Sequence, residues 1–231
     1  MKRILPLFLA VCIFFIPVFA EETPMAEPFS QLQSWGVLSK DTAPDFDMPI
    51  TRRQLLTALC QCVYGIIPYP DQSVLESGSG FVFTDIEDGT QDCSLAVNAA
   101  AVYHMLSGSY EEDPYLRFAG LDQTVTEEEA VIFTVRLLDW YTGGAGELAR
   151  LHRQGFANAY WTVAENLGLL QNRYDTDGSY HLTAEQKEEP LTLGQMTGLL
   201  HNLLLTKLTV YDSGTTYSAY LLGEVVARMD T

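Results

Sequence analysis

The chain has 231 residues, of which 30 are Asp or Glu and 13 are Lys or Arg, so its formal net charge is −17. An acidic chain without a local basic stripe excludes nucleic acid as a partner and is repelled by anionic membranes. Hydrophobic residues make up 47% of the chain and aromatic residues 11%. That content is enough to bury a core and excludes a disordered chain. The length suits one or two domains.

The first twenty residues have the pattern of a signal peptide. Lys2 and Arg3 precede a long apolar run, and the small residues Val18 and Ala20 stand three and one before the expected cleavage. The alternative is an uncleaved anchor, because the apolar run is just long enough to span a bilayer. We expect cleavage, export and no membrane contact afterwards. Without the leader the net charge becomes −19, since Lys2 and Arg3 are its only charged residues.

Three cysteines remain after the leader: Cys60, Cys62 and Cys93. An odd number does not form a complete disulfide framework. Either Cys60 or Cys62 pairs with Cys93 in an oxidising compartment, or all three are buried thiols that act as small hydrophobic residues. No fourth cysteine and no nearby histidine pair complete a zinc site, so we expect neither a metal nor a cofactor.

Three segments share the sequence pattern of a helix start. Each has a threonine at the expected N-cap, Gln or Glu three residues later, and apolar residues just before the cap and at the fourth helical position. This pattern predicts a capping box and a hydrophobic staple. The cap pairs are Thr51 with Gln54, Thr126 with Glu129, and Thr192 with Gln195.

Each expected helix has a partner upstream that ends in glycine. Gly36, Gly108 and Gly168 suit the left-handed position just past a helix end. The unit is therefore a helix, a glycine stop, a loop, a threonine cap and a second helix. The helix after Thr126 is apolar on nearly every side, so we expect it to be the most buried element. Repeated two-helix units bury their apolar faces against one another.

At these motifs the chain resembles the S-layer homology (SLH) family. The segments that carry the resemblance are Phe83-Thr84-Asp85-Ile86, Gly36-Val37-Leu38, Gly168-Leu169-Leu170 and Thr51-Arg52-Arg53-Gln54. The resemblance covers most of residues 28–208 in three degenerate copies. It implies a mostly helical pseudo-threefold bundle. It also implies non-covalent attachment to an anionic secondary cell-wall polymer at the bacterial cell surface or cell wall.

We therefore expect an all-α fold of three SLH-like units with little or no β-structure. The expected boundaries are a signal peptide at 1–20, units at 21–68, 80–142 and 156–208, and a C-terminal amphipathic helix at 209–231. The last expectation rests on Tyr217, Leu221, Val225 and Met229, which recur every four residues.

The resemblance assigns polymer contact to Arg52, because a guanidinium suits an anionic sugar. Glu127 and Leu193 occupy the equivalent positions of the other units, so only one pocket looks chemically plausible. The full set of candidate polymer-binding residues is Arg52, Arg53, Asp85 and Trp35. Each also has a structural alternative: an exposed helix-start arginine, a turn cap for Asp85, and a core position for Trp35.

The sequence carries no signal for catalysis. The four histidines lack the spacing of a metal site, and no nucleophile elbow or phosphate-binding glycine loop is present. The leading expectation is thus a non-catalytic module that attaches to a cell-wall polysaccharide. The alternative is a protein-interaction or scaffold module that keeps the SLH-like fold without binding polymer. A carboxylate-dependent glycoside hydrolase is a distant third.

Overall fold

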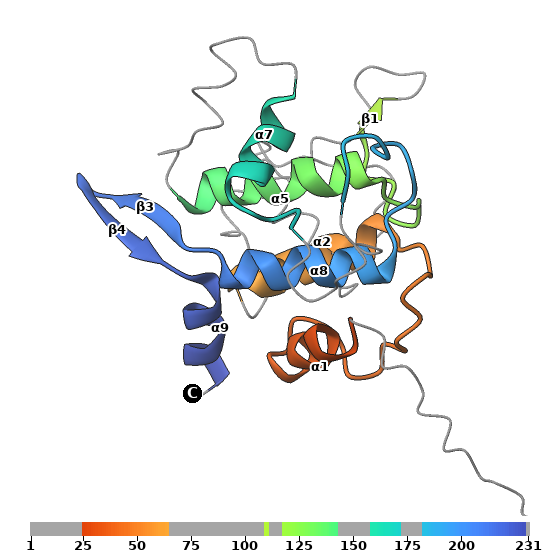
Figure 1. Ribbon diagram of the computed structural model, residues 1–231, viewed down its shortest axis with the longest axis horizontal. Helices are drawn as coiled ribbons and strands as arrows, with labels where there is room; N and C mark the ends of the chain where they lie inside the picture. Colours follow the sequence, from red (N-terminus) through yellow and green to blue (C-terminus); the bar gives the residue numbers. More distant parts are fainter. Residues whose placement is uncertain (1–24, 65–108, 111–116, 143–157, 172–181, 230–231) are drawn as a thin grey trace, which may run out of the picture.

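A computed structural model describes residues 25–64, 109–110, 117–142, 158–171 and 182–229 (Figure 1). The expected opening motif of the second unit, with Asp85, and the glycine stop at Gly108 lie outside these residues, as does Cys93. The helices are α1 (Ala26–Ser34), α2 (Arg52–Tyr64), α5 (Glu127–Tyr141), α7 (Ala159–Asn166), α8 (Leu193–Leu205) and α9 (Leu221–Met229). The strands are β1 (Ser109–Tyr110), β2 (Arg117–Phe118), β3 (Leu208–Asp212) and β4 (Thr215–Ala219).

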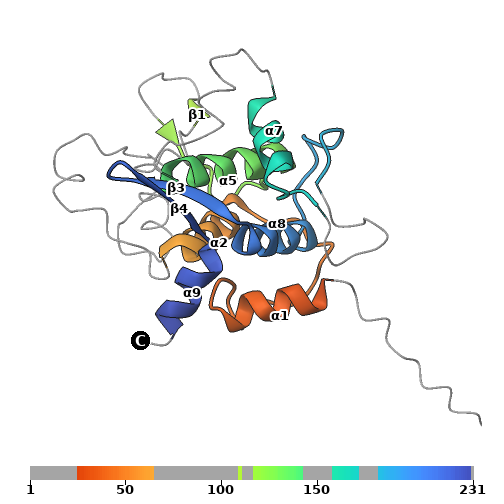
Figure 2. The same ribbon diagram turned by 60° about the vertical axis from the view of Figure 1, so that its left-hand side comes forward.

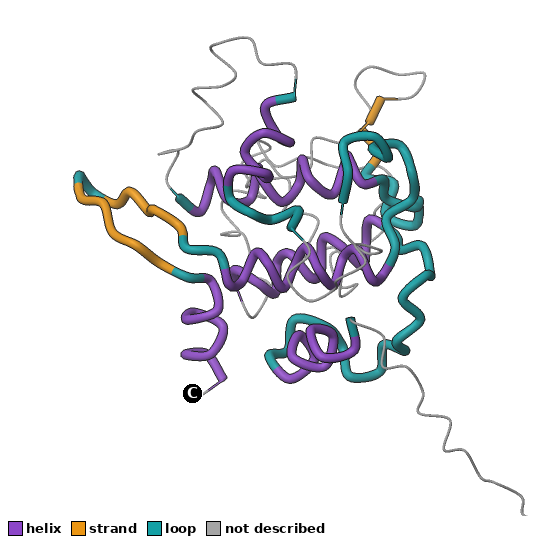
Figure 3. Tube along the Cα trace, in the orientation of Figure 1, coloured by secondary structure: helices purple, strands orange, loops and turns teal. Residues whose placement is uncertain are grey.

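The expectation of an all-α fold is wrong. The described residues contain two antiparallel two-stranded sheets, β1 with β2 and β3 with β4, beside the six helices (Figure 3). The architecture is a mixed one, in which α2 packs against both α5 and α8, while α1 packs on α8 and α7 on α5. Figures 1 and 2 show α1 and α7 on opposite sides of these three helices.

The three threonine-capped helices, α2, α5 and α8, begin at one closed cycle of backbone hydrogen bonds. The residue before each cap donates its N–H to the equivalent residue of another unit. These bonds are Ile50 N–H to Leu191 O (3.0 Å), Leu191 N–H to Val125 O (2.9 Å) and Val125 N–H to Ile50 O (3.1 Å). Isolated β-bridges follow the same cycle: Pro49 with Thr192, Thr51 with Thr124, and Thr126 with Pro190. We call residues 46–54, 119–129 and 187–195 the cap ring.

Helices α1 and α7 both end at a glycine in the left-handed conformation. Gly36 and Gly168 each have φ of +71°. Two backbone bonds close each end, as in a Schellman motif. They run from Val37 N–H to Leu32 O and from Gly36 N–H to Gln33 O, and from Leu169 N–H to Ala164 O and from Gly168 N–H to Glu165 O.

The most buried of the described helices is α8, and the expectation that the helix after Thr126 holds this place is wrong. Eleven of the thirteen residues of α8 are buried. Several of them are polar and find partners inside: Asn202 Nδ2 donates to Leu169 O (2.9 Å), and Thr197 Oγ1 donates to Leu193 O (2.7 Å). Arg136 on α5, in contrast, is only partly buried, so one side of that helix is partly open.

The C-terminal segment is a hairpin followed by a helix, which corrects the expected helix over 209–231. Strands β3 and β4 pair from Leu208↔Ala219 to Asp212↔Thr215. The two turn residues, Ser213 and Gly214, have φ of 47° and 89°, the positive values of a type I′ turn that matches the twist of a hairpin. Tyr217, the first residue of the four-residue repeat, therefore belongs to strand β4 and not to a helix.

Candidate functional site

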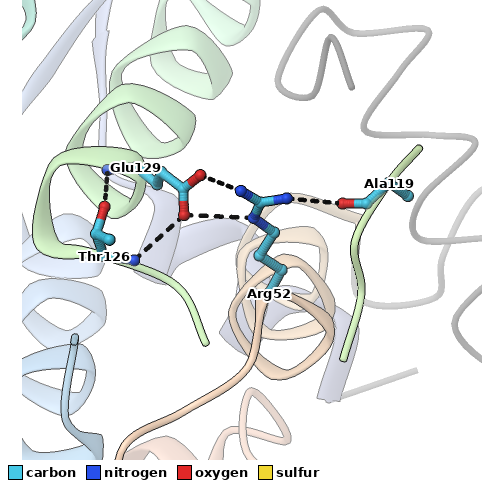
Figure 4. A network of polar contacts seen from close by, with 4 residues as sticks. All are labelled: Arg52, Ala119, Thr126 and Glu129. Atoms are coloured by element: carbon cyan, nitrogen blue, oxygen red, sulfur yellow. Dashed lines mark hydrogen bonds and ion pairs between the residues drawn. The ribbon is translucent and has the colours of Figure 1, made fainter. Parts of the chain in front are cut away.

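Arg52, the principal polymer-binding candidate, is bonded within the protein. Its Nε donates to Glu129 Oε2 (3.3 Å), its Nη2 pairs with Glu129 Oε1, and its Nη1 donates to Ala119 O (3.2 Å) (Figure 4). Its side chain is 15% exposed and that of Glu129 27%. A bidentate guanidinium–carboxylate pair is a strong, directional contact. The arrangement joins the start of α2 to the start of α5.

The backbone beside Arg52 is fitted to the guanidinium. Gly120 has φ of +63°, and a Cβ placed on it would lie 2.6 Å from Arg52 Nη1 and 2.7 Å from Gln123 Oε1. A side chain at this position is therefore opposed both by the backbone conformation and by the space that Arg52 occupies. Gly120 and Arg52 form one packed structural unit.

Equivalent positions of two units show how the first helical residue is used inside the protein. There the first helical residue bonds to the residue at the third helical position of another unit. Arg52 meets Glu129 in this way, and Gln195 Nε2 donates to Glu127 Oε1. At the equivalent position of the third helix, Leu193 is a buried apolar side chain. The arginine and the glutamate are thus matched to internal partners.

Glu127 is a carboxylate with only 1% of its surface exposed. Besides Gln195, it accepts from the backbone N–H of Thr183 (3.3 Å). Hydrogen bonds of this kind offset the cost of burying a carboxylate. The contacts hold the loop before α8 on the start of α5, so Glu127 serves the cap ring.

The helix starts in the cap ring leave no backbone N–H groups for an anion. At each start the capping threonine and the residue three positions later exchange the two bonds of a capping box. The first and second helical N–H groups donate to carbonyls of the neighbouring unit, at 2.9–3.1 Å. A helix N-terminus binds anions through these same four groups. Here all of them are already bonded.

Arg53 is more accessible than Arg52. Its side chain is 34% exposed and its Nη2 lies 3.0 Å from Oδ1 of Asp122, whose side chain is 84% exposed. Its Nε also donates to Asp122 (3.0 Å). An exposed pair of this kind contributes little to stability. Of the two candidate arginines, Arg53 is therefore the one whose side chain is more accessible to solvent.

Trp35 directly follows α1, the helix that packs on α8. Its indole stacks on the imidazole of His201, with ring centroids 5.5 Å apart and an interplanar angle of 21°. His201 is buried and its Nε2 lies 2.6 Å from Gln31 Oε1. One face of the Trp35 ring is thus covered, and the stack fastens α1 to α8. Asp85, the remaining candidate, lies outside the described residues.

Both described cysteines are buried free thiols in α2. Burial raises the pKa of the Cys60 thiol from 9.0 to about 12. Burial and the neighbouring Cys60 raise the pKa of Cys62 further, while Arg228 opposes that shift. A thiol that stays protonated is a poor nucleophile, so these two side chains act as core residues.

Large hydrophobic side chains are exposed at the C-terminal end of the described chain. We call Tyr211, Tyr217, Tyr220, Val226 and Met229 the C-terminal surface; each is between 41% and 54% exposed. Tyr211 and Tyr217 occupy successive register positions, so they lie on opposite faces of the hairpin. Hydrogen bonds join α9, which carries part of this surface, to α5 and α2. The Tyr141 hydroxyl bonds to Glu224, and Arg228 donates to the Val63 and Gln61 carbonyls of α2 (2.7 and 3.0 Å). Sequence reasoning missed this site, although three tyrosines within ten residues signal it.

No protein-family model matches the chain, and no curated protein matches it either. Within the described residues, no three His, Cys, Asp or Glu side chains gather closely enough to hold a metal ion. None of the described helices is both long and apolar enough to cross a bilayer. The SLH resemblance accordingly stays a prediction based on the motifs.

Proposed function

We propose that the chain is a non-catalytic, exported interaction module, in which an SLH-like scaffold presents the C-terminal surface to a protein partner. The observation that carries the proposal is the contrast in exposure. Arg52 and the helix starts are bonded internally, whereas five large hydrophobic side chains face solvent on one hairpin and one helix. Exposed aromatic residues and methionine are the side chains enriched in protein interfaces.

The occupied guanidinium argues against Arg52 as the polymer contact. To bind an anionic sugar, Arg52 would have to release Glu129 or share its guanidinium, and Glu129 also holds the N–H of Thr126 (3.2 Å). Breaking that arrangement leaves a partly buried carboxylate without its counter-ion, which is costly. A ligand would therefore compete with an interaction that joins two units of the scaffold.

The chain's net charge of −17 disfavours an anionic polymer as well. At physiological ionic strength, exposed charges separated by more than about 8 Å are largely screened from one another. The charges close to the binding site therefore have the greatest effect on an anionic ligand. The charges nearest to Arg53 include Asp122, which lies beside it. An uncharged contact surface, in contrast, meets no such local repulsion.

A photo-crosslinking experiment tests the proposal. Benzoylphenylalanine replaces Tyr217 in one variant and Tyr160 of α7 in a matched control, and both are expressed in the native host. Crosslinking at position 217 is expected to give a discrete protein adduct that disappears when excess unlabelled protein is added. Equal adducts at both positions, or none at 217, would contradict the proposal.

Polymer attachment is the second candidate, because Arg53 offers a guanidinium that is one-third exposed. It predicts that the mature protein co-sediments with deproteinised sacculi and that Arg53→Gln abolishes this binding. A thermal melt of Arg53→Gln that matches the parent protein would show that any loss of binding is not due to unfolding. Sedimentation with deproteinised sacculi would then favour the polymer over a protein partner.

A further inference from the structure

Among the described strands, β4 pairs with β3 alone, so its outer edge is open. A two-residue turn makes Asp212↔Thr215 a hydrogen-bonded pair, and such pairs alternate along an antiparallel ladder. Tyr211 and Thr216 are consequently a non-bonded pair whose backbone groups point outward. The Tyr211 N–H does so, since it donates to Thr142 O at the end of α5 (3.1 Å). By the same alternation, Thr216 and Ser218 point their N–H and C=O groups away from β3.

The two edges of the hairpin differ in how they are protected. The edge of β3 is bonded to residue 142, whereas the first four residues of β4 are exposed. Natural edge strands are usually blunted by lysine, proline or a bulge. Strand β4 reads Thr-Thr-Tyr-Ser-Ala and has a continuous register with β3, so it has none of these devices. Figure 1 shows the hairpin projecting beyond the helices, with its turn far from them.

We propose that β4 pairs antiparallel with β4 of a second copy of this chain. This inference rests on the proposed function, because it uses part of the C-terminal surface. A two-fold axis at Tyr217 places Thr216 opposite Ser218 of the second copy, and Ser218 opposite its Thr216. Both outward-pointing residues of each strand are then hydrogen-bonded. The two Tyr217 side chains meet as a non-bonded pair, the arrangement in which cross-strand aromatic residues come closest.

Local charge favours a second copy as the occupant. Residues 213–223 contain no charged side chain, in a chain that carries 30 acidic and 13 basic ones. Two copies of an acidic chain repel one another, and this strip adds no charge of its own to that repulsion. Because the contact is isologous, every group offered by one edge is met by its complement on the other.

The interface would be small, so the self-association is expected to be weak. Two short edge strands bury much less than the ~1,200 Å² of a standard stable complex. Salt should strengthen it, since added ions screen the repulsion between the two acidic bodies. A hydrophobic contact between neutral strips is not itself weakened by screening, which separates this pairing from one driven by salt bridges.

Sedimentation velocity over a concentration series tests the pairing in mature protein that carries Cys93→Ser. Thr216→Pro removes an outward N–H from β4, and Thr209→Pro removes the equivalent N–H from the other edge of the hairpin. Thr216→Pro and Ser218→Lys are expected to weaken dimerisation by about tenfold or more, since each symmetric contact is lost twice. Thr209→Pro should leave it unchanged. Matching thermal melts of all variants show that folding is intact.

Disulfide trapping provides an independent readout. Tyr217→Cys places two cysteines across the proposed axis, within the Cα separation that a disulfide spans, and should give a covalent dimer on oxidation. Thr209→Cys, on β3, should not. Monomers at every concentration, a dimer insensitive to Thr216→Pro, or equal trapping at both positions would each overturn the pairing. A monomer that still crosslinks a different protein at Tyr217 overturns the pairing but leaves the proposed function standing.

Discussion

The cap ring and the C-terminal surface handle polar and apolar groups in opposite ways. In the cap ring, polar groups are turned inward: the N–H groups of three helix starts, Arg52 and Glu127 all have partners inside the protein. At the C-terminal surface, apolar groups are turned outward, and the β4 edge offers backbone groups to solvent. Residues with the chemistry of a binding site are structural in the cap ring, whereas the contact that we propose rests on exposed hydrophobic residues.

The largest expected loss of stability comes from a substitution in the hydrophobic core. Leu200→Ala removes a side chain of α8 with no exposed surface and should lower the free energy of unfolding by about 2–5 kcal/mol. Val226→Ala on the C-terminal surface, where the side chain is 41% exposed, should change it by less than about 0.5 kcal/mol. Urea denaturation measures both. Equal losses would contradict the contrast between the two regions.

Removing the Arg52 guanidinium is the next largest change. Arg52→Met should destabilise the fold by about 1–3 kcal/mol, because it leaves the partly buried Glu129 without its charged partner. Arg53→Met should cost less than about 0.5 kcal/mol, since its pair is exposed. A double-mutant cycle of Arg52→Met with Glu129→Gln measures the coupling. A coupling free energy of zero would mean that the Arg52–Glu129 pair does not stabilise the contact between α2 and α5.

Two glycine substitutions compare the backbone of the cap ring with that of α9. It forces an alanine into φ of +63° and against the Arg52 guanidinium, so we expect a loss of about 1–2 kcal/mol. Gly223→Ala in α9, where nothing lies within 4 Å of the added Cβ, should be neutral or stabilising by up to about 1 kcal/mol. Thermal melts of the two variants compare them directly. A smaller loss for Gly120→Ala in the Arg52→Met background would identify the guanidinium as the obstacle.

The capping boxes of the cap ring and the glycine stops at Gly36 and Gly168 could be predicted from the sequence, because both are local patterns. Thr126 and Glu129 are three residues apart, so their pairing needs no knowledge of the fold. The contact of Arg52 with Glu129 joins residues 77 positions apart, and no local pattern carries it. The family resemblance assigned Arg52 to a ligand, since the sequence did not show which partner the guanidinium already had.

The errors at the C-terminus and in α8 have different physical causes. The hairpin was missed because an apparent four-residue period from Tyr217 to Met229 outweighed the β-branched and aromatic residues of 208–219 and the Ser213-Gly214 turn. The expectation that α5 is the most buried helix rested on its apolar residues on nearly every side. Helix α8 is more buried although it contains His201 and Asn202. These polar side chains are buried with hydrogen-bonding partners, which a count of apolar residues does not anticipate.

A further expected effect concerns pH. The pKa of Cys60 is raised from 9.0 to about 12 in the folded protein, so the folded state holds a proton that the unfolded state releases. The stability this provides is complete below pH 9 and is lost as the pH rises toward 12. Urea denaturation between pH 8 and 10.5 should show Cys60→Ala with a shallower alkaline decline than the parent protein. An identical decline would contradict the burial of this thiol.

Thiol labelling gives a matched check at neutral pH. In the mature Cys93→Ser protein only Cys60 and Cys62 remain, and both are buried. A thiol reagent should react with neither in the native state beyond the rate of opening, and with both in urea. Rapid native labelling would mean that the core around α2 is open.

The most direct test of the proposed function compares the protein crosslinks formed at two surface positions in the native host. Benzoylphenylalanine at Tyr217 samples the C-terminal surface, and the same residue at Arg53 samples the edge of the cap ring. We expect a specific protein adduct at 217, none at 53, and no retention of the protein by deproteinised sacculi. Arg53-dependent retention by those sacculi, with no adduct at 217, would contradict it.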